Sequence, residues 1–405
     1  MRKLSNRLIT KIKKSILEEM KKMKKLRRIL VSGGAVAACA ISVLALTGCG
    51  GSQPGQSSTS TTAGEAKSKR ENFKVTDMLG REVEIPGNAR SFACIAAGSL
   101  RYYSYVADKS QLVGIEDVEK TWNPEGRPYV AALGDISGLK SIGKGGPQAK
   151  ANADALIEAA PDVIFSMYNT SKQEAEDLQS KTKIPVVVLS YGKDVVFSED
   201  TYKSLELIGK ITDHEKRAEE VISYLKNTES DLKKRVANVS EKPKAYLGAL
   251  SYKGIKGITG TAGKYMPFDV IGVKNVAADA GLKGPYADMD KEALIQHNPD
   301  NIFVDAEGLA VVKKDFQENP DFYKSLKAVQ EGRVYSQLPF HNYYTNIEMA
   351  IGDAYYIGTV LYPEQFKDID PGSKYDEVSE KLLGVKTYEK TSKKYGPYNK
   401  IDLSK

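Results

Sequence analysis

The chain has 405 residues, which is too long for one ordinary core and suits two domains with additional segments. Its composition, 41% hydrophobic and 27% charged, excludes a disordered, collagen-like or polytopic membrane protein. Residues 1–48 carry 12 Lys and Arg against 2 acidic residues, so this segment accounts for more than the whole formal charge of +7. The remainder is slightly acidic, and no nucleic-acid partner is expected.

The first segment has the layout of a secretion signal. Basic residues between Lys21 and Arg28 precede an uncharged run over 29–46, as a positive n-region precedes an apolar h-region. At 18 residues the run is also long enough for a retained transmembrane helix. The sequence Leu-Thr-Gly-Cys that ends at Cys49 resembles a bacterial lipobox, which implies cleavage before Cys49 and lipidation of its thiol. We therefore predict a lipoprotein signal peptide over residues 1–48.

A tether follows the lipid site. Residues 49–70 are rich in Gly, Ser, Thr and Gln and cannot bury enough apolar surface to fold, which predicts a flexible lipid-anchored leash. Of the three cysteines, Cys39 lies in the leader and Cys49 takes the lipid. Cys94 then has no disulfide partner, and its apolar surroundings, SFACIAA, predict a buried structural thiol.

The body alternates β-branched runs with amphipathic helices, which predicts α/β layers around parallel sheets. The expected strands are Ser91–Ala96, Gln111–Ile115, Asp162–Ser166, Pro185–Ser190, Lys244–Leu250, Asn301–Asp305 and Arg333–Gln337. An internal repeat supports two similar lobes: ALIEAAPDVIF at 155–165 and ALIQHNPDNIF at 293–303 match at seven of eleven positions. Each copy predicts a helix, a Pro-Asp turn and a buried strand.

A long helical segment separates the lobes. Thr212 and Glu215 have the spacing of a capping box, and apolar residues at helical spacing follow as far as about residue 238. A second capping box, Thr345 and Glu348, is expected to open a helix that Pro363 stops. We predict an N-terminal lobe over 71–197, linker helices over 198–240 and a C-terminal lobe over 241–405.

Two α/β lobes joined by one long helix, behind a lipid tether, resemble the class III substrate-binding proteins of ABC importers. The resemblance covers roughly residues 72–365. Its motifs are TDMLGREVEIP, LIEAAPDVIF, LIQHNPDNIF, LKAVQEGRVYSQLP and NYYTNIEMAIGDAYYIGTVLYP, the last most similar to the iron-complex branch. It implies two Rossmann-like lobes with a ligand cleft between them, and a ligand that is a ferric siderophore or similar iron complex. Haem, cobalamin, and the molybdate or tungstate of related members remain alternatives.

The resemblance also implies how the chain works. It would be a monomer held by the lipid on Cys49 at the extracytoplasmic face of the cell membrane, delivering its ligand to an ABC permease dimer with a separate ATPase. Family members present one carboxylate on each lobe to the permease. Asp154 and Glu292, at equivalent positions just before the two ALI motifs, are the expected counterparts, with two solvated helix N-terminal acids as the alternative.

Signals for catalysis are weak. The run from Gly138 to Lys144 begins like a phosphate-binding loop, but Gly145 replaces the hydroxyl residue that would hold Mg²⁺. The body has three histidines, His214, His297 and His341, too few for a zinc- or manganese-capture site. We therefore expect no catalytic residue, cofactor or metal site, against a secreted α/β enzyme or a surface adhesin as rival hypotheses.

Ligands of open α/β sheets bind outside the carboxyl ends of the strands, which nominates the loops there. Aromatic and amide side chains would suit a bulky chelate, and Arg or Lys its negative charge. The expected ligand-binding residues are Ser99, Arg101, Tyr102, Lys144, Gly145, Tyr168 and Asn169 in the first lobe, and Tyr252, Lys264, Tyr265, His341, Asn342 and Tyr343 in the second.

Overall fold

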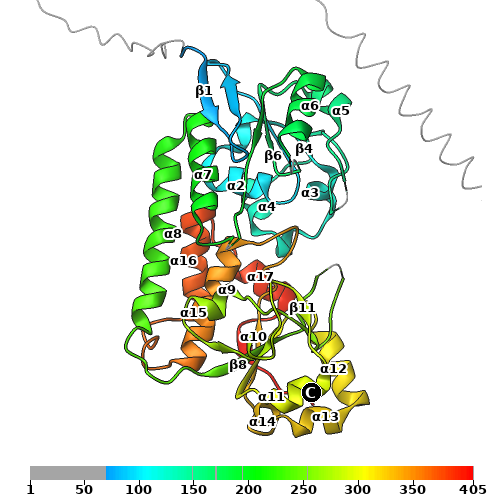
Figure 1. The fold of residues 1–405 in the computed structure, drawn as a ribbon, viewed down its shortest axis with the longest axis vertical. Helices are drawn as coiled ribbons and strands as arrows, with labels where there is room; N and C mark the ends of the chain where they lie inside the picture. The colour runs from blue at the N-terminus through cyan, green and yellow to red at the C-terminus, as the bar shows by residue number, and fades with distance from the viewer. Residues whose placement is uncertain (1–69, 148, 169–170, 194, 253, 405) are drawn as a thin grey trace, which may run out of the picture. The chain divides into compact units, whose positions relative to one another are not determined.

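A computed structural model describes residues 70–147, 149–168, 171–193, 195–252 and 254–404. The predicted signal peptide, Cys49, nearly all of the tether, and Asn169 lie outside the described residues. Residues from Lys67 to the end form one unit, which contains two five-stranded sheets (Figure 1).

The first sheet is parallel throughout, in the order β5-β4-β3-β6-β7. Its strands are β3 Phe92–Ile95, β4 Leu112–Ile115, β5 Lys140–Ser141, β6 Val163–Ser166 and β7 Val186–Val188. Side chains alternate between its two faces, as the pleat requires. Ala93 and Ile95 pack with α5 (Ala153–Ala159) and α6 (Lys172–Thr182), whereas Phe92 and Cys94 face the opposite core.

That opposite core contains the helix after β3 and a helical hairpin. Its helices are α2 Ser99–Val106, α7 Glu199–Thr212 and α8 Glu215–Arg235. The remaining helical segments of this lobe are η1 Lys109–Gln111, α3 Asp117–Thr121, η2 Pro124–Gly126 and α4 Pro128–Leu133. Cys94 is buried as predicted, and desolvation raises the pKa of its thiol.

A short antiparallel hairpin, β1 Phe73–Thr76 and β2 Glu82–Ile85, precedes the first sheet. Its turn explains the motif TDMLGREVEIP. The Asp77 carboxylate accepts the N–H groups of Leu79 and Arg81 at 3.0 Å each, and Gly80 adopts φ +71°, which favours glycine. The buried Arg81 guanidinium pairs with Asp77 and donates to the Val186 carbonyl, which joins the hairpin to the edge of the sheet.

The second sheet has the order β10-β8-β12-β13-β14 and is parallel except for β14. Its strands are β8 Lys244–Gly248, β10 Lys274–Asn275, β12 Asn301–Asp305, β13 Val334–Gln337 and β14 Asn399–Lys400, and a separate two-stranded sheet pairs β9 Gly260–Thr261 with β11 Ala287–Asp288. The helices are α9 Met266–Asp269, α10 Val276–Asp279, α11 Lys291–His297, α12 Leu309–Glu318, α13 Pro320–Ser325, α14 Lys327–Gln330 and α15 Ile347–Leu361. The fold class and all seven predicted strands are confirmed.

One hydrophobic core runs through both lobes. Phe92 of the first sheet, Leu225 of α8, and Leu247 of the second sheet belong to the same cluster of packed side chains. The last helices, α16 Pro371–Leu383 and α17 Tyr388–Tyr395, also contact both lobes, since α16 packs on α15 and α4. The α7–α8 hairpin and α16 therefore brace the lobes along one side (Figure 1).

Both capping-box predictions are wrong. Thr212 is buried in the last turn of α7, where its hydroxyl donates to the Ile208 carbonyl, and α8 begins after His214 without a side-chain cap. Thr345 lies before α15, whose N-cap is Asn346. Glu348 does not cap that helix with Thr345, because its carboxylate accepts the Tyr105 hydroxyl from the other lobe. A hydrogen bond within α7 replaces the first predicted cap, and a tertiary contact replaces the second.

Candidate ligand site between the lobes

In each five-stranded sheet, the strand that comes first along the chain is followed by a residue of unusual backbone conformation. Ala96 follows β3 with φ 72°, and Ala249 follows β8 with φ 64°, so each of these strands is followed by a left-handed alanine. Few residues with a Cβ adopt this conformation, and alanine has the smallest side chain among them. The loop between β13 and α15 extends from the second lobe to meet these strand ends.

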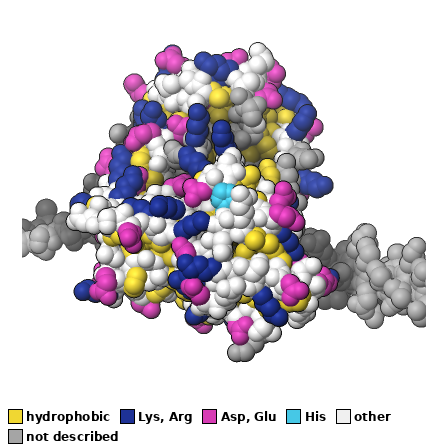
Figure 2. Space-filling view, turned by 60° about the horizontal axis from the view of Figure 1, so that its bottom comes forward, with side chains coloured by type: hydrophobic (Ala, Val, Ile, Leu, Met, Phe, Trp, Pro, Cys, Tyr) yellow, Lys and Arg dark blue, Asp and Glu magenta, His cyan; other side chains and the backbone are white. Residues whose placement is uncertain are grey.

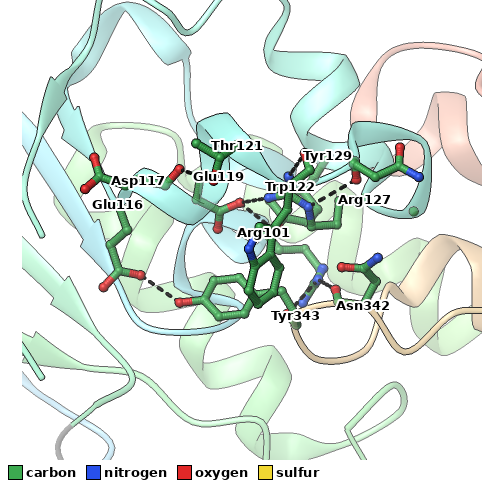
Figure 3. Close-up of polar contacts among 12 residues, drawn as sticks. Arg101, Glu116, Asp117, Glu119, Thr121, Trp122, Arg127, Tyr129, Asn342 and Tyr343 are labelled. Atoms are coloured by element: carbon green, nitrogen blue, oxygen red, sulfur yellow. Dashed lines mark hydrogen bonds and ion pairs between the residues drawn. The ribbon is translucent and has the colours of Figure 1, made fainter. Parts of the chain in front are cut away.

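Glu116 lies at the centre of the polar contacts, directly after β4. One carboxylate oxygen, Oε2, accepts the Tyr343 hydroxyl at 2.8 Å (Figure 3). The same oxygen accepts the Ala96 N–H at 3.1 Å. The other oxygen accepts the Tyr168 hydroxyl. Burial raises the pKa of Glu116, and these hydrogen bonds oppose that rise.

Arg101 ties the β13–α15 loop to the first lobe. Its side chain is fully buried; Nη2 donates to the carbonyls of Asn342 and Tyr343 at 2.9 Å each, and Nε donates to Asn346 Oδ1 at 3.1 Å (Figure 3). The guanidinium carbon also lies 4.6 Å from the Tyr129 ring centroid. Arg101 Nη1 is buried and has no hydrogen-bond partner among the described residues. The two N–H groups of Nη1 are thus left for a group that enters between the lobes.

A second buried cation supports the wall beside Arg101. Arg127 pairs with Glu119, whose carboxylate also accepts the Tyr129 hydroxyl at 2.8 Å. Arg127 Nη2 donates to the Trp122 carbonyl at 2.6 Å. Desolvation raises the pKa of Glu119, and the charge of Arg127 counters it. This network fixes the segment that carries Trp122, the single tryptophan of the chain.

Aromatic rings line the second lobe's side. Tyr252 stacks on Tyr286 with centroids 3.8 Å apart, and Tyr344 stacks on Tyr191 of the first lobe at 3.7 Å. The Tyr286 hydroxyl lies 3.1 Å from His341 Nδ1. Desolvation, and then the Arg101 charge, lower the pKa of His341 to about 3, so this imidazole is neutral at physiological pH.

The predicted site residues divide into three groups. Arg101, Gly145, Tyr168, His341, Asn342 and Tyr343 are part of the junction or touch its polar network. Lys144, Tyr252 and Lys264 are exposed. Ser99, Tyr102 and Tyr265 were expected to face the ligand, but their side chains are buried in the fold. Their hydroxyls bond the Phe165 carbonyl, Thr201 and Gln337 respectively.

The sequence analysis missed Glu116, Tyr191 and Tyr286. Glu116 directly follows the predicted strand Gln111–Ile115, so its position at the end of a strand could have identified it. Tyr191 and Tyr286 carry no local signal, because partners far away in the sequence bring them to the junction.

A pocket of about 940 Å³ lies next to this junction. Trp122 is shared between them: its ring lines the pocket and meets the Tyr343 ring edge-on at 5.3 Å. The opposite wall is α17, with Lys390, Lys393 and Lys394. Among the described residues, no group of three or more His, Cys, Asp or Glu side chains is placed to hold a metal ion.

A family model described as periplasmic binding protein matches residues 95–338, which is more than half of the chain. The chain therefore belongs to the periplasmic binding protein family. Two Bacillus subtilis proteins are relatives at 25% identity. The uncharacterized ABC transporter substrate-binding lipoprotein YvrC aligns over 76% of this chain and 90% of its own length, and the petrobactin-binding protein YclQ over 68% and 83%.

Solved structures share the fold. A periplasmic solute-binding protein from Veillonella parvula has a TM-score of 0.62 at 20% identity, covering 78% of this chain and 94% of that one. The molybdate-binding MolA of Haemophilus influenzae has a TM-score of 0.60 at 19% identity, with coverages of 78% and 98%. Within the part of the chain that the structure describes, no helix is both long and apolar enough to cross a membrane.

Proposed function

We propose that this chain is an extracytoplasmic, lipid-anchored receptor that captures a ferric siderophore or similar iron complex between its lobes for an ABC importer. The observation that carries the proposal is the aromatic lining of the junction where the two strand-end edges meet, built from Trp122, Tyr191, Tyr252, Tyr286 and Tyr344. Wide aromatic surfaces suit a bulky chelate better than a small oxyanion. The petrobactin-binding relative supports the same ligand class.

Binding without catalysis is the second part of the proposal. The described cysteine, Cys94, is buried with a raised pKa, which opposes a nucleophilic role. Desolvation lowers the pKa of His341 to about 3, which makes its imidazole a weak general base towards the Tyr286 and Thr345 hydroxyls beside it. On the face shown in Figure 2, acidic and basic side chains are interspersed, which does not favour a nucleic-acid surface.

The ligand can be tested through Trp122, which contacts Tyr343 at the junction. Residues 71–405 would be titrated with ferric siderophores of catecholate and hydroxamate type, then with molybdate and tungstate, and then with haem and cobalamin, while tryptophan fluorescence is recorded. Saturable quenching by iron complexes alone supports the proposal. A response to the oxyanions alone assigns the protein to oxyanion transport, and a response to haem or cobalamin alone would also replace the iron-complex assignment.

We also propose that Asp154 and Glu292 dock the receptor on its permease. Both are exposed in the first turns of α5 and α11, the helices of the internal repeat. Three residues later each helix exposes an isoleucine, Ile157 at 47% and Ile295 at 41%. Residues three apart share one face of a helix, so each lobe presents an acid beside an apolar side chain. A partner with two similar halves, such as a permease dimer, fits this matched pair.

Charge reversal separates docking from binding. The double variant Asp154→Arg and Glu292→Arg is expected to keep its ligand affinity and to lose ligand uptake in cells. The matched control, Glu176→Arg with Glu364→Arg, makes the same charge change at two other exposed acids and should retain uptake. Normal uptake by the first variant would contradict the docking assignment.

A further inference from the structure

The β13–α15 loop places one aromatic side chain of the second lobe inside the strand-end edge of the first. Tyr343 is buried there: its hydroxyl donates to Glu116 Oε2 at 2.8 Å and accepts the Gly146 N–H at 3.0 Å (Figure 3). Tyr168 bonds the other Glu116 oxygen, and the Trp122 ring lies edge-on to Tyr343. We call Glu116, Gly146, Trp122 and Tyr168 the Glu116 socket.

The first lobe builds this socket by itself. The Ala96 N–H holds the Glu116 carboxylate in place, and Gly145 and Gly146 turn with φ +68° and +98°, where glycine is favoured. A Cβ on Gly145 would lie 2.6 Å from Val118 Cγ2 and 2.9 Å from Glu116 Cβ. The turn therefore sits directly against Glu116 and presents the Gly146 N–H beside the carboxylate. Tyr343 is the only contributor to the arrangement just described that comes from the other lobe.

The segment that supplies Tyr343 is held in a strained conformation. Tyr343 and Tyr344 have φ values of 49° and 74°, two consecutive left-handed residues with bulky side chains. The Arg101 guanidinium holds the loop through the carbonyls of residues 342 and 343. Such a conformation persists only where surrounding contacts enforce it. A group that replaces the Tyr343 contacts in the socket would remove one of the two sets of contacts that hold this conformation.

We propose that Tyr343 is a built-in occupant of a ligand subsite, and that the Glu116 socket takes an aromatic ring bearing a protonated hydroxyl from the captured compound. This inference rests on the proposed function, and it adds the chemistry of one part of the ligand. The incoming hydroxyl would donate to Glu116 and accept from Gly146, as the Tyr343 phenol does. Tyr343 then withdraws, and the contacts it makes across the lobes are replaced by contacts to ligand.

The charge of the socket defines which hydroxyl fits. A ring oxygen that has lost its proton to bind a metal carries negative charge and would be repelled by the Glu116 carboxylate. A phenol or catechol hydroxyl that keeps its proton is accepted, because the carboxylate requires a donor. The subsite is therefore specific for the part of a chelate that faces away from its metal.

The test uses the full chain and its Tyr343→Ala variant, with phenol as the probe and benzene as its apolar control, read out by Trp122 fluorescence and calorimetry. We expect phenol to bind the variant at least tenfold more tightly than the wild type and more tightly than benzene. Adding Glu116→Gln should reduce the preference for phenol, because a neutral amide oxygen accepts the phenol hydroxyl less strongly than a carboxylate does. Tyr344→Ala, which empties the neighbouring stack on Tyr191, should show no such preference.

A competition experiment links the socket to the ligand. A ferric complex whose chelator carries a spare aromatic hydroxyl should displace phenol from Tyr343→Ala, whereas a ferric hydroxamate without aromatic rings should not. Tyr343→Phe keeps the ring and removes the hydroxyl, and should bind that aromatic complex several-fold more tightly than wild type.

Two results would overturn the inference. One is equal affinity of the Tyr343→Ala variant for phenol and benzene. The other is binding of the aromatic ferric complex to this variant without displacement of the bound phenol. Failure of every ferric complex to bind wild type or variants would overturn the proposed function instead, and the phenol-against-benzene comparison would still judge the socket.

Discussion

The two copies of the internal repeat have the same scaffold and different loops. In each, a short helix ends in a left-handed residue, Ala160 or Asn298, before a buried strand. Leu156 and Leu294 are both fully buried at equivalent positions. The segments after the strands differ: β6 leads to Tyr168, which bonds Glu116, whereas β12 leads into α12. The two copies share their packing, and they differ in the loops after their strands.

The strand-end edges of the two lobes differ in chemistry as well. The first lobe carries three buried charges, Arg101, Glu116 and Glu119, and each is held by hydrogen bonds to side chains or backbone around it. The second lobe carries an aromatic stack that ends at the neutral His341. The first edge is therefore rigid and specific in its polar contacts, and the second supplies broad apolar contact.

Removing Arg101 should have the largest effect, because it separates the two edges. Arg101→Ala deletes four hydrogen bonds from a fully buried cation and leaves the carbonyls of residues 342–344 and Asn346 Oδ1 without that donor. We expect the free energy of unfolding to fall by about 4 kcal/mol, measured by urea denaturation.

Arg217 is a matched control for Arg101. It also donates to three carbonyls, of Tyr105, Lys381 and Leu382, but its side chain is 33% exposed. Arg217→Ala should cost no more than about half as much, because water replaces part of what is lost. Equal losses in the free energy of unfolding for the two variants would show that the burial of Arg101 does not strengthen its contribution to stability.

The next prediction tests whether the two repeat copies are equivalent in packing. Leu156→Ala and Leu294→Ala each remove a fully buried side chain, and each should lower the free energy of unfolding by about 3 kcal/mol. The exposed neighbours Ile157 and Ile295 provide the control, since alanine there should change stability by less than about 0.5 kcal/mol. A large cost at Leu156 with none at Leu294 would break the equivalence.

Acidification should weaken the second lobe's edge through His341. Its pKa is about 3 in the folded chain and near 6.5 when unfolded, so below pH 6.5 the unfolded state gains a proton that the folded state does not. His341 therefore removes stability as pH falls from 6.5 towards 3, by at most about 1.4 kcal/mol per pH unit.

The His341→Gln variant isolates this contribution. The raised pKa values of Glu116, Glu119 and Glu348 act in the opposite direction, but they are shared with the wild type and cancel in the difference. Between pH 6.5 and 5 the variant should lose up to about 2 kcal/mol less than the wild type in urea denaturation. Parallel stability curves for the two proteins would exclude a titrating role for His341.

The sequence predicted the scaffold well and the site in part, for physical reasons. Buried β-branched runs identified the seven strands, since the alternating faces of each strand are set locally. The two capping boxes failed because the Thr212 hydroxyl donates to a carbonyl one turn back in its own helix, and Glu348 accepts from Tyr105 of another helix. Within the candidate site, the strand ends indicate which loops meet between the lobes, but they do not fix the direction of each side chain. The prediction placed Tyr102 and Tyr265 at an open wall, where both are buried instead.

The junction depends on pairing across long sequence separations. Arg101 and Asn342 are 241 residues apart, and no local pattern signals that a predicted ligand contact is a buried tie between lobes. The stack of Tyr191 on Tyr344 is equally non-local. Such contacts can be inferred only once it is known that the carboxyl ends of the strands in the two sheets face each other.

The smallest effect is expected at Tyr252, whose side chain is 43% exposed and stacks on Tyr286. Tyr252→Ala should lower the free energy of unfolding by about 1 kcal/mol, because an aromatic pair adds little beyond the area it buries and water already reaches this ring. If the aromatic side chains of the second lobe contact the chelate as proposed, the binding free energy for ferric siderophores should fall by more than the free energy of unfolding does. Tyr252→Phe, which keeps the stack, should restore both. A variant that loses stability but binds unchanged would leave Tyr252 as packing alone, and would confine ligand contact to the Glu116 side of the junction.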